Sequence, residues 1–215
     1  MAKCLPHVLT VLVVILGCTI WWQSTQGFRA FTWETYRRIQ IENRPVPVPN
    51  IQLENQSRQL FDLAFLRGKV LVINFIYTRC PTVCGLTGKA FSKLQTAIVQ
   101  NGYQDSVRLL SISLDPQYDT PEKLNAYLQR FTKRLDNSWQ VVRPTNLQQA
   151  KHLLNRLGVV SISDGQGGII HNAATHIVDQ RGQLVQIIDE NQFETTLTSI
   201  ENLLTKSEVG LKHVI

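Results

Sequence analysis

The longest apolar segment of the chain is Leu5–Trp22, which contains no Asp, Glu, Lys or Arg. Its 18 residues exceed the apolar core of a signal peptide and approach the about 20 residues of a transmembrane helix. The pair Trp21-Trp22 is typical of an aromatic anchor at a membrane interface. The pattern favours an uncleaved N-terminal membrane anchor over residues 1–22, and Cys4 and Cys18 belong to this segment.

Two other interpretations of the apolar segment stay open. Ile15-Leu16-Gly17-Cys18 resembles a lipobox, which would make the segment a lipoprotein signal with Cys18 as the lipidated residue. The segment is also compatible with a buried helix of a soluble domain.

Two shorter apolar runs, Val70–Tyr77 and Val107–Leu114, are continuous and rich in β-branched residues. Such runs predict strands that are buried on both faces of a sheet. Apolar residues at roughly helical spacing follow the first run and predict a helix from Val83 to about Asn101. Strands that alternate with helices indicate an α/β fold.

The rest of the chain continues this alternation. Thr120-Pro121-Glu122 is typical of a helix start and predicts a helix that ends near Phe131. Further strands are expected at Trp139–Arg143, Ala174–Asp179 and Gln183–Ile188, further helices at Leu147–Leu157 and Phe193–Leu204, and a leading hairpin at Ile51–Leu53 and Gln59–Phe61. We therefore predict an α/β sandwich of thioredoxin type over residues 50–207. A proline-containing linker, residues 23–49, precedes it, with Arg44–Pro49 as an extended spacer.

Composition and charge exclude several classes of protein. The chain has 215 residues, of which 43% are hydrophobic and 18% charged, so it is neither disordered nor a multi-span membrane protein. Half of the net charge of +6 lies in the first 50 residues, and no run of Lys and Arg exceeds two residues. We expect no nucleic-acid partner. Four cysteines are too few for a disulfide-built scaffold.

Candidate chemistry is concentrated in Cys80-Pro81-Thr82-Val83-Cys84, where a predicted buried strand passes into a predicted helix. The free N–H groups and the dipole at a helix start stabilise a thiolate. Residues four apart on a helix share one side, so the sulfurs of Cys80 and Cys84 can lie on the same side of the first helical turn. Oxidised, the pair forms a disulfide. Reduced, it offers two soft sulfur ligands suited to Cu(I).

A copper site needs a further ligand, and the chain has five histidines. His7 and His213 lie near the ends of the chain, and His152 falls on a predicted helix. His171 follows the glycine-rich loop at residues 164–168 and precedes a strand, so a flexible loop can carry its imidazole toward the sulfurs. His176 lies inside a predicted strand and is better explained as a packed residue.

Three separated motifs resemble the SCO/SenC family of copper chaperones for cytochrome c oxidase assembly. The first is Gly68-Lys69-Val70 with Tyr77-Thr78-Arg79-Cys80-Pro81-Thr82-Val83-Cys84. The second is Ser113-Leu114-Asp115-Pro116-Gln117-Tyr118-Asp119-Thr120-Pro121. The third is His171, followed at the family's spacing by Asp179 and Gly182. The motifs occur in the family's order and span roughly residues 50–205.

The resemblance implies a thioredoxin-like fold and a copper site formed by Cys80, Cys84 and His171. It implies that the protein delivers Cu(I) to the copper A site on the copper-bearing subunit of cytochrome c oxidase. An imidazole ligand would also allow Cu(II) to bind. It also implies a single anchor and a domain on the periplasmic side of a bacterial inner membrane. Arg29, Arg37 and Arg38 alone would argue for a cytoplasmic domain by the positive-inside rule. The resemblance outweighs this count.

Rival functions use the same residues. A membrane-anchored thiol–disulfide oxidoreductase would use Cys80 and Cys84, would keep the acceptor's cysteines reduced, and would itself be reduced by a thioredoxin-like partner. A peroxidase of the same fold would need one activated cysteine, with Arg79 as the neighbouring cation. Asp115 and Asp119 form a paired-carboxylate candidate, but a turn and helix-cap role explains them better. We expect a metallochaperone, with the oxidoreductase as the alternative.

Overall fold

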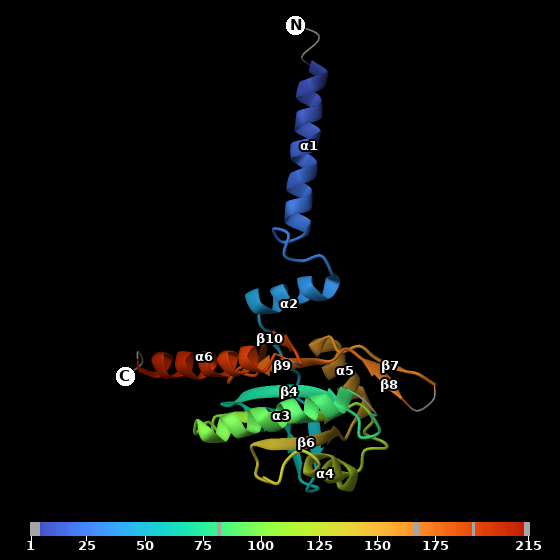
Figure 1. The fold of residues 1–215 in the computed structure, drawn as a ribbon, viewed down its shortest axis with the longest axis vertical. Coiled ribbons are helices and arrows are strands. Elements are labelled where there is room, and N and C mark those ends of the chain that lie inside the picture. The colour runs from blue at the N-terminus through green and yellow to red at the C-terminus, as the bar shows by residue number, and fades with distance from the viewer. Residues whose placement is uncertain (1–4, 81–82, 166–167, 191, 213–215) are drawn as a thin grey trace. The chain divides into compact units, whose positions relative to one another are not determined.

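The computed structural model describes residues 5–80, 83–165, 168–190 and 192–212 (Figure 1). Four residues named above, Cys4, Pro81, Thr82 and His213, lie outside these ranges. The chain divides after Arg44 into two compact units. Each unit is described by itself below.

The first unit begins with helix α1 (Leu5–Ser24). Its window His7–Ser24 has a mean hydropathy of 1.6 and no buried part. Among the described residues it is the one helix that is long and apolar enough to cross a membrane. A core helix of a soluble domain would be mostly buried, so this feature fits the predicted anchor better than that alternative.

Helix α2 (Trp33–Asn43) lies in the segment for which the sequence predicted only a linker. The Thr32 hydroxyl caps its start by accepting a hydrogen bond from the N–H of Thr35 at 3.1 Å. Glu34 then pairs with Arg37 and Arg38, one turn further along the helix. Capping and spacing of charge therefore form a helix that has little apolar periodicity.

The second unit contains an eight-stranded sheet with the order β1-β10-β9-β4-β5-β6-β2-β3. The strands are β1 (Val46–Pro47), β2 (Gln52–Asn55), β3 (Leu60–Asp62), β4 (Val70–Ile76), β5 (Val107–Ser113), β6 (Trp139–Pro144), β9 (Ala174–Val178) and β10 (Gln183–Asp189). Strands β4, β5 and β6 are parallel, and the strands on either side of them pair antiparallel. Every residue of β4 and β5 is buried, as their continuous apolar runs predict.

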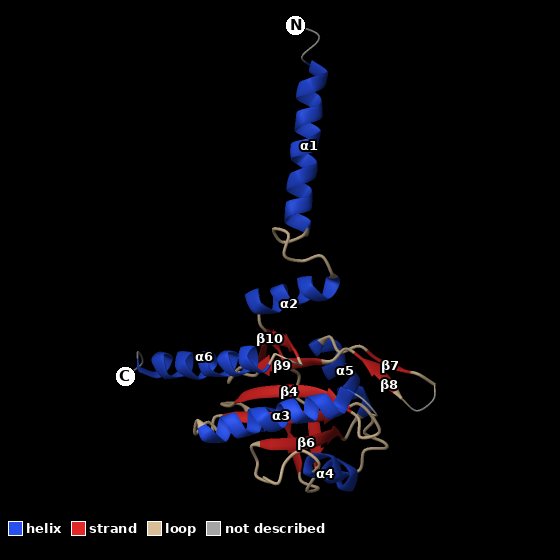
Figure 2. Cartoon of the chain, in the orientation of Figure 1, coloured by secondary structure: helices blue, strands red, loops and turns tan. Residues whose placement is uncertain are grey.

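Helices cover both faces of this sheet (Figure 2). Helix α3 (Val83–Gln100) connects β4 to β5, and helix α4 (Pro121–Gln129) connects β5 to β6. Both crossovers move in the same direction across the sheet. Right-handed crossovers in one direction place both helices on one face. Helix α6 (Phe193–Lys212) joins them there, and the three helices share one apolar core with β4, β5 and β6. Helix α5 (Leu147–Leu157) covers the other face.

The proline segment before the domain differs from the expected spacer, because part of it belongs to the sheet. Val46 pairs with Leu184 and Pro47 with Gln183, which adds β1 as an edge strand next to β10. Proline is tolerated at a sheet edge, where its missing N–H removes no internal hydrogen bond. The N–H of Val48 extends the contact by donating to Gly182 O at 3.0 Å.

A second, two-stranded sheet is formed by β7 (Ser161–Ser163) and β8 (Ile169–His171). The sequence predicted a glycine-rich loop here and no strands. Serines and glycines give these residues little of the apolar alternation that indicates a strand. The 3-10 turn η1 (Leu63–Leu66) completes the described elements.

Candidate functional site

Cys80 and Cys84 lie close together where β4 passes into α3. Cys80 is half-buried in the loop, and its sulfur accepts a hydrogen bond from the N–H of Cys84 at 3.4 Å. Cys84 is 2% exposed in the first turn of α3. Both are free thiols. The predicted strand–CxxxC–helix arrangement is therefore present, with one accessible and one buried sulfur.

Cys84 is a weakly acidic thiol. Burial is the main cause that raises its pKa to about 12, and the neighbouring Cys80 and Glu190 contribute to the rise. Cys84 therefore stays protonated at neutral pH unless a metal ion displaces its proton. Half-buried Cys80 is the sulfur that a reagent or a partner protein reaches first.

Tyr77 links the cysteine loop to the β7–β8 hairpin. Its hydroxyl interacts with the Cys80 thiol and with the main chain of Ile169 on β8, and burial is the main reason that its pKa is raised. The edge of its ring also meets the ring of His171, with 6.3 Å between the ring centroids. Tyr77 thus contacts both the first cysteine and the predicted histidine ligand.

His171 is the last residue of β8 and is half-buried. Its Nδ1 lies 3.4 Å from the carbonyl oxygen of Asn172, and burial lowers its pKa, which favours a neutral imidazole able to bind a metal. Within the described part of the chain, however, no three His, Cys, Asp or Glu side chains are grouped as a metal site. The structure brings Cys80 and Cys84 together and places His171 across Tyr77 from Cys80.

His176 occupies the middle of β9 and is buried. Its Nε2 lies 3.2 Å from the carbonyl oxygen of Leu157 on α5, and its ring packs edge-on against Phe75 at 5.5 Å. This is the packed role predicted from the sequence. His152 is exposed on α5.

The sequence analysis did not predict the hydrogen bonds that the Asp119 side chain makes. This carboxylate is fully buried and accepts hydrogen bonds from three donors: the N–H of Thr78 at 3.2 Å, the hydroxyl of Thr78 at 2.5 Å and the hydroxyl of Ser113 at 2.6 Å. Burial raises the pKa of Asp119, and these hydrogen bonds oppose the rise. The expected helix cap is different in the structure, because the Thr120 side chain at the N-cap accepts no capping hydrogen bond from the helix main chain.

Asp115 makes the predicted turn and one further contact. Its carbonyl oxygen accepts from the N–H groups of Tyr118 and Asp119, and its carboxylate pairs with Arg79. The Arg79 guanidinium lies 4.0 Å from the centroid of the Tyr118 ring. The segment 113–119 therefore holds the loop 78–80 at several points, and the two aspartates do not form an acid–base pair.

Glu190, at the end of β10, is a second residue that the sequence analysis did not single out. Burial raises its pKa to about 7, and its charge is one of the causes that raise the pKa of Cys84. The sequence signal that could have indicated Glu190 is its position as an acidic residue just after the last predicted strand.

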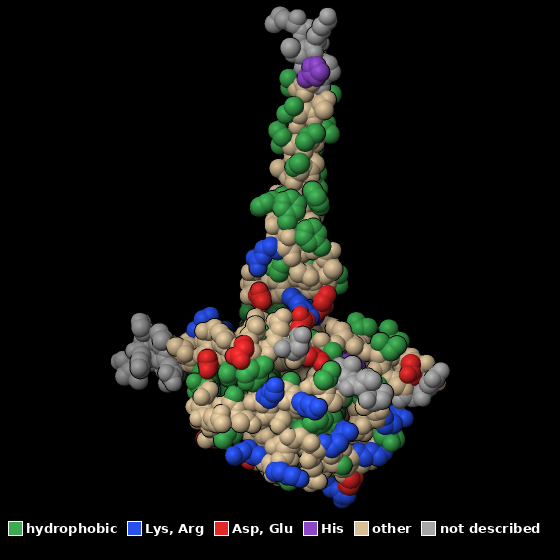
Figure 3. All heavy atoms as spheres, in the orientation of Figure 1, with side chains coloured by type: hydrophobic (Ala, Val, Ile, Leu, Met, Phe, Trp, Pro, Cys, Tyr) green, Lys and Arg blue, Asp and Glu red, His purple; other side chains and the backbone are tan. Residues whose placement is uncertain are grey.

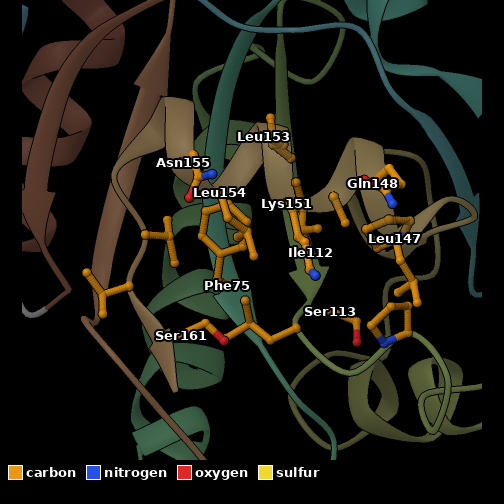
Figure 4. Close-up of a pocket in the computed structure, with 16 residues that line it drawn as sticks. Phe75, Ile112, Ser113, Leu147, Gln148, Lys151, Leu153, Leu154, Asn155 and Ser161 are labelled. Atoms are coloured by element: carbon orange, nitrogen blue, oxygen red, sulfur yellow. The ribbon is translucent and has the colours of Figure 1, made fainter. Parts of the chain in front are cut away.

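A cavity of about 650 Å³ lies between α5 and the ends of β4 and β5 (Figure 4). Phe75 and Ile112 from the strands face Leu153 and Leu154 of the helix across it. None of Cys80, Cys84 and His171 lines it. The thiols and the imidazole therefore lie outside this cavity.

Known proteins share this sequence pattern and this fold. The family model described as SCO1/SenC matches residues 43–205. The SCO1 protein homolog of Bacillus subtilis (strain 168) is 26% identical over 145 residues, which cover 66% of this chain and 72% of that protein.

Solved structures agree. A SCO1/SenC family lipoprotein from Bacillus anthracis str. Ames superposes with a TM-score of 0.68 at 26% identity, covering 75% of this chain and 98% of its own. Bradyrhizobium japonicum ScoI, solved with copper bound, superposes with a TM-score of 0.61 at 24% identity, covering 73% of this chain and 99% of its own. The fold is thioredoxin-like, and by its matched sequence this chain belongs to the SCO1/SenC family.

Proposed function

We propose that this protein is a copper chaperone that binds copper through Cys80, Cys84 and His171 and delivers it to the copper A site of cytochrome c oxidase. The observation that carries the proposal is the pair of adjacent free thiols at the start of α3, with an imidazole on the neighbouring hairpin. Two sulfurs and one imidazole form a soft ligand set that suits Cu(I), and the imidazole also allows Cu(II). The copper-bound relative from Bradyrhizobium supports the copper-binding part of the proposal.

Closure of the site needs a rearrangement around Tyr77. This ring contacts His171 and its hydroxyl reaches Cys80, so the imidazole must move past it to reach the sulfurs. Strands β7 and β8 pair with each other and, in the described part of the chain, with no strand of the large sheet. We infer that the hairpin shifts as a unit when copper binds.

Copper is the cargo, and the protein's own groups control its uptake and release. The Cys84 thiol must lose its proton to bind, so copper affinity should fall as the pH drops. Accessible Cys80 exchanges first with an acceptor's ligand, and buried Cys84 follows. Each exchange replaces one protein–copper bond with one acceptor–copper bond.

The apolar helix α1 supports a membrane location. We propose that it anchors the protein in a bacterial inner membrane, with the domain on the periplasmic side, where an oxidase's copper-bearing subunit would meet it. Lipidation at Cys18 is the competing form of attachment, and the mass of the mature chain decides between them.

The test measures Cu(I) stoichiometry and affinity of the full-length protein in detergent, by competition with a chromogenic chelator. We expect one Cu(I) per chain for the wild type and weaker binding for His171→Ala. His152→Ala, which removes an exposed histidine of α5, is the matched control and should bind as the wild type does. Loss of binding should also follow Cys80→Ser or Cys84→Ser. Unchanged affinity in His171→Ala would overturn the ligand set.

One observation favours a second candidate, a thiol–disulfide oxidoreductase that keeps the acceptor's cysteines reduced. An accessible first cysteine and a buried second cysteine with a pKa of about 12 suit attack by Cys80 and resolution by Cys84. The acceptor's disulfide would be reduced as Cys80 and Cys84 become a disulfide, which a thioredoxin-like protein would then reduce. Fast reduction of the acceptor by the wild type and equally by His171→Ala would favour this function.

A further inference from the structure

Helix α3, which carries Cys84, has a strongly cationic exposed side. The helix contains Lys89 and Lys93 and no Asp or Glu, and both lysines are exposed. Residues three and four apart on a helix share one face. Leu86, Lys89 and Lys93 follow this spacing, so they form one exposed stripe that starts two residues after Cys84.

The segment after α4 adds three more cations to this stripe. The hydroxyl of Ser92 donates to the carbonyl oxygen of Phe131 at 2.8 Å, and the side-chain amide of Gln95 donates to that of Arg134 at 3.3 Å. These bonds fix the segment 130–134 along α3. It carries three exposed cations, Arg130, Lys133 and Arg134. We call the five side chains Lys89, Lys93, Arg130, Lys133 and Arg134 the α3 cationic surface.

Little negative charge offsets this surface. Arg134 pairs with Asp136, and the other four cations form no salt bridge within the described residues. Two acidic side chains near the α4 side of this surface are already paired, Glu122 with Arg58 and Asp115 with Arg79. Figure 3 shows Lys and Arg side chains gathered over α3 and toward α4, with few Asp and Glu among them.

The surface is also preorganised and partly apolar. Arg130 lies over two aromatic rings, 4.9 Å from the centroid of Tyr127 and 5.5 Å from that of Phe131. Leu86 is 69% exposed, and Leu135 at the other side is 55% exposed. Exposed apolar residues set among ordered cations are typical of a protein interface, whereas an anionic lipid surface needs the charge alone.

We propose that the α3 cationic surface docks an acidic face of the protein that accepts copper from Cys80 and Cys84. This inference rests on the proposed function. Lys89 and Lys93 lie about 7.5 Å and about 13.5 Å along the helix from Cys84, so a partner held on them is close to the end of α3 at which half-buried Cys80 lies. Opposite charges steer the encounter and set its orientation, and Leu86 supplies an apolar contact on the exposed side of the first turns of α3.

The experiment uses the full-length, Cu(I)-loaded protein in zwitterionic detergent and the soluble apo domain of an oxidase's copper-bearing subunit as the probe. The rate constant of copper transfer is measured across a range of NaCl concentrations. The variant Lys89→Glu with Lys93→Glu should lower this rate constant at least about tenfold at low salt and flatten its salt dependence. Its Cu(I) affinity and thermal stability should match the wild type.

The matched control is Lys151→Glu with Lys206→Glu, which changes the net charge equally at exposed positions of α5 and α6. It should stay within about twofold of the wild type. An unchanged rate constant in the α3 variant would overturn the inference while leaving the proposed function intact. If the wild type transfers no copper, the proposed function fails. The inference is then tested by the binding of the same probe to the wild type at low and high salt. If this binding is absent or does not depend on salt, the inference is overturned. Reduced adsorption to phosphatidylglycerol vesicles with unchanged transfer would assign the surface to lipid and also overturn it.

Discussion

The carboxylate of Asp119 accepts hydrogen bonds from both the main-chain N–H and the hydroxyl of Thr78, two residues before Cys80. The same carboxylate accepts from Ser113 at the end of β5. It therefore joins the cysteine loop to the neighbouring strand inside the domain, and we regard Asp119 as a positioning residue for Cys80.

Asp119→Ala should destabilise the domain and misplace Cys80. The change leaves two donors of half-buried Thr78 and one of buried Ser113 without their acceptor, and we expect the free energy of unfolding to fall by about 2–4 kcal/mol. Urea unfolding followed by tryptophan fluorescence measures this loss. Asp115→Ala removes a partly exposed ion pair with Arg79 and should cost no more than about 1 kcal/mol. Equal losses in the two variants would contradict the positioning role.

Cys80 should react with iodoacetamide at pH 8 much faster than Cys84. Cys80 is half-exposed, whereas Cys84 is buried and its pKa is raised to about 12, so it contributes almost no thiolate. Peptide mass spectrometry after short exposure measures both rates in one sample. Cys84→Ser should leave Cys80 reactive. Preferential labelling of Cys84 would show that the order of the two thiols is the reverse.

Alanine substitutions at two glycines of α3 should change the free energy of unfolding in opposite directions. A β-carbon at Gly88 would lie 2.4 Å from the ring of Phe131, whereas one at Gly85 would meet nothing within 4 Å. Gly88→Ala should lower the free energy of unfolding by about 1–3 kcal/mol, because the ring and the attached segment must shift. Gly85→Ala should raise it by up to about 1 kcal/mol through helix propensity. Urea titrations compare the two, and the same sign for both would contradict the packing described.

Glu190 should make the domain less stable as the pH rises. Burial raises its folded-state pKa to about 7, against about 4.3 in an unfolded chain. The folded state therefore holds more protons between these values, and stability falls across that window. Glu190→Gln should raise the melting temperature relative to the wild type at pH 8 and have little effect at pH 4.

The control for this pH dependence is Glu122→Gln. The pKa of Glu122 is lowered to about 2, mainly by its hydrogen bond with Arg58, so its ionised form is favoured in the folded protein. Removing that charge should lower the melting temperature slightly at pH 8. A Glu190→Gln variant that melts at the wild-type temperature at both pH values would contradict the burial of this carboxyl group.

Most of the domain's fold could be predicted from its sequence. Strands β4 and β5 end within one residue of their predicted limits, and α5 has the predicted limits Leu147–Leu157. Long apolar runs and regular helical spacing specify these elements locally. Helix α6 extends to Lys212, beyond the predicted end at Leu204, because its last turns lack a clear stop signal.

The elements that were missed depend on polar or long-range contacts. Helix α2 is formed by a Thr32 cap and by Glu34 pairs, which leave a weak apolar pattern. Asp119 lies 41 residues from Thr78, and a pattern read locally as a turn and cap contains no sign of that bond. The cysteine pair could be predicted because both residues lie on one strand–helix junction. The position of His171 on the other side of Tyr77 from Cys80 could not be predicted, because it depends on a hairpin whose sequence has little apolar alternation.

The hairpin β7–β8 carries His171 on strands that, within the described residues, form a sheet of their own. Substitutions on it leave the hydrogen-bond ladder of the eight-stranded sheet intact. In the proposed copper site, exposed positions of this hairpin can therefore change and alter how His171 meets the metal, while the strand pairing of the main sheet stays as it is.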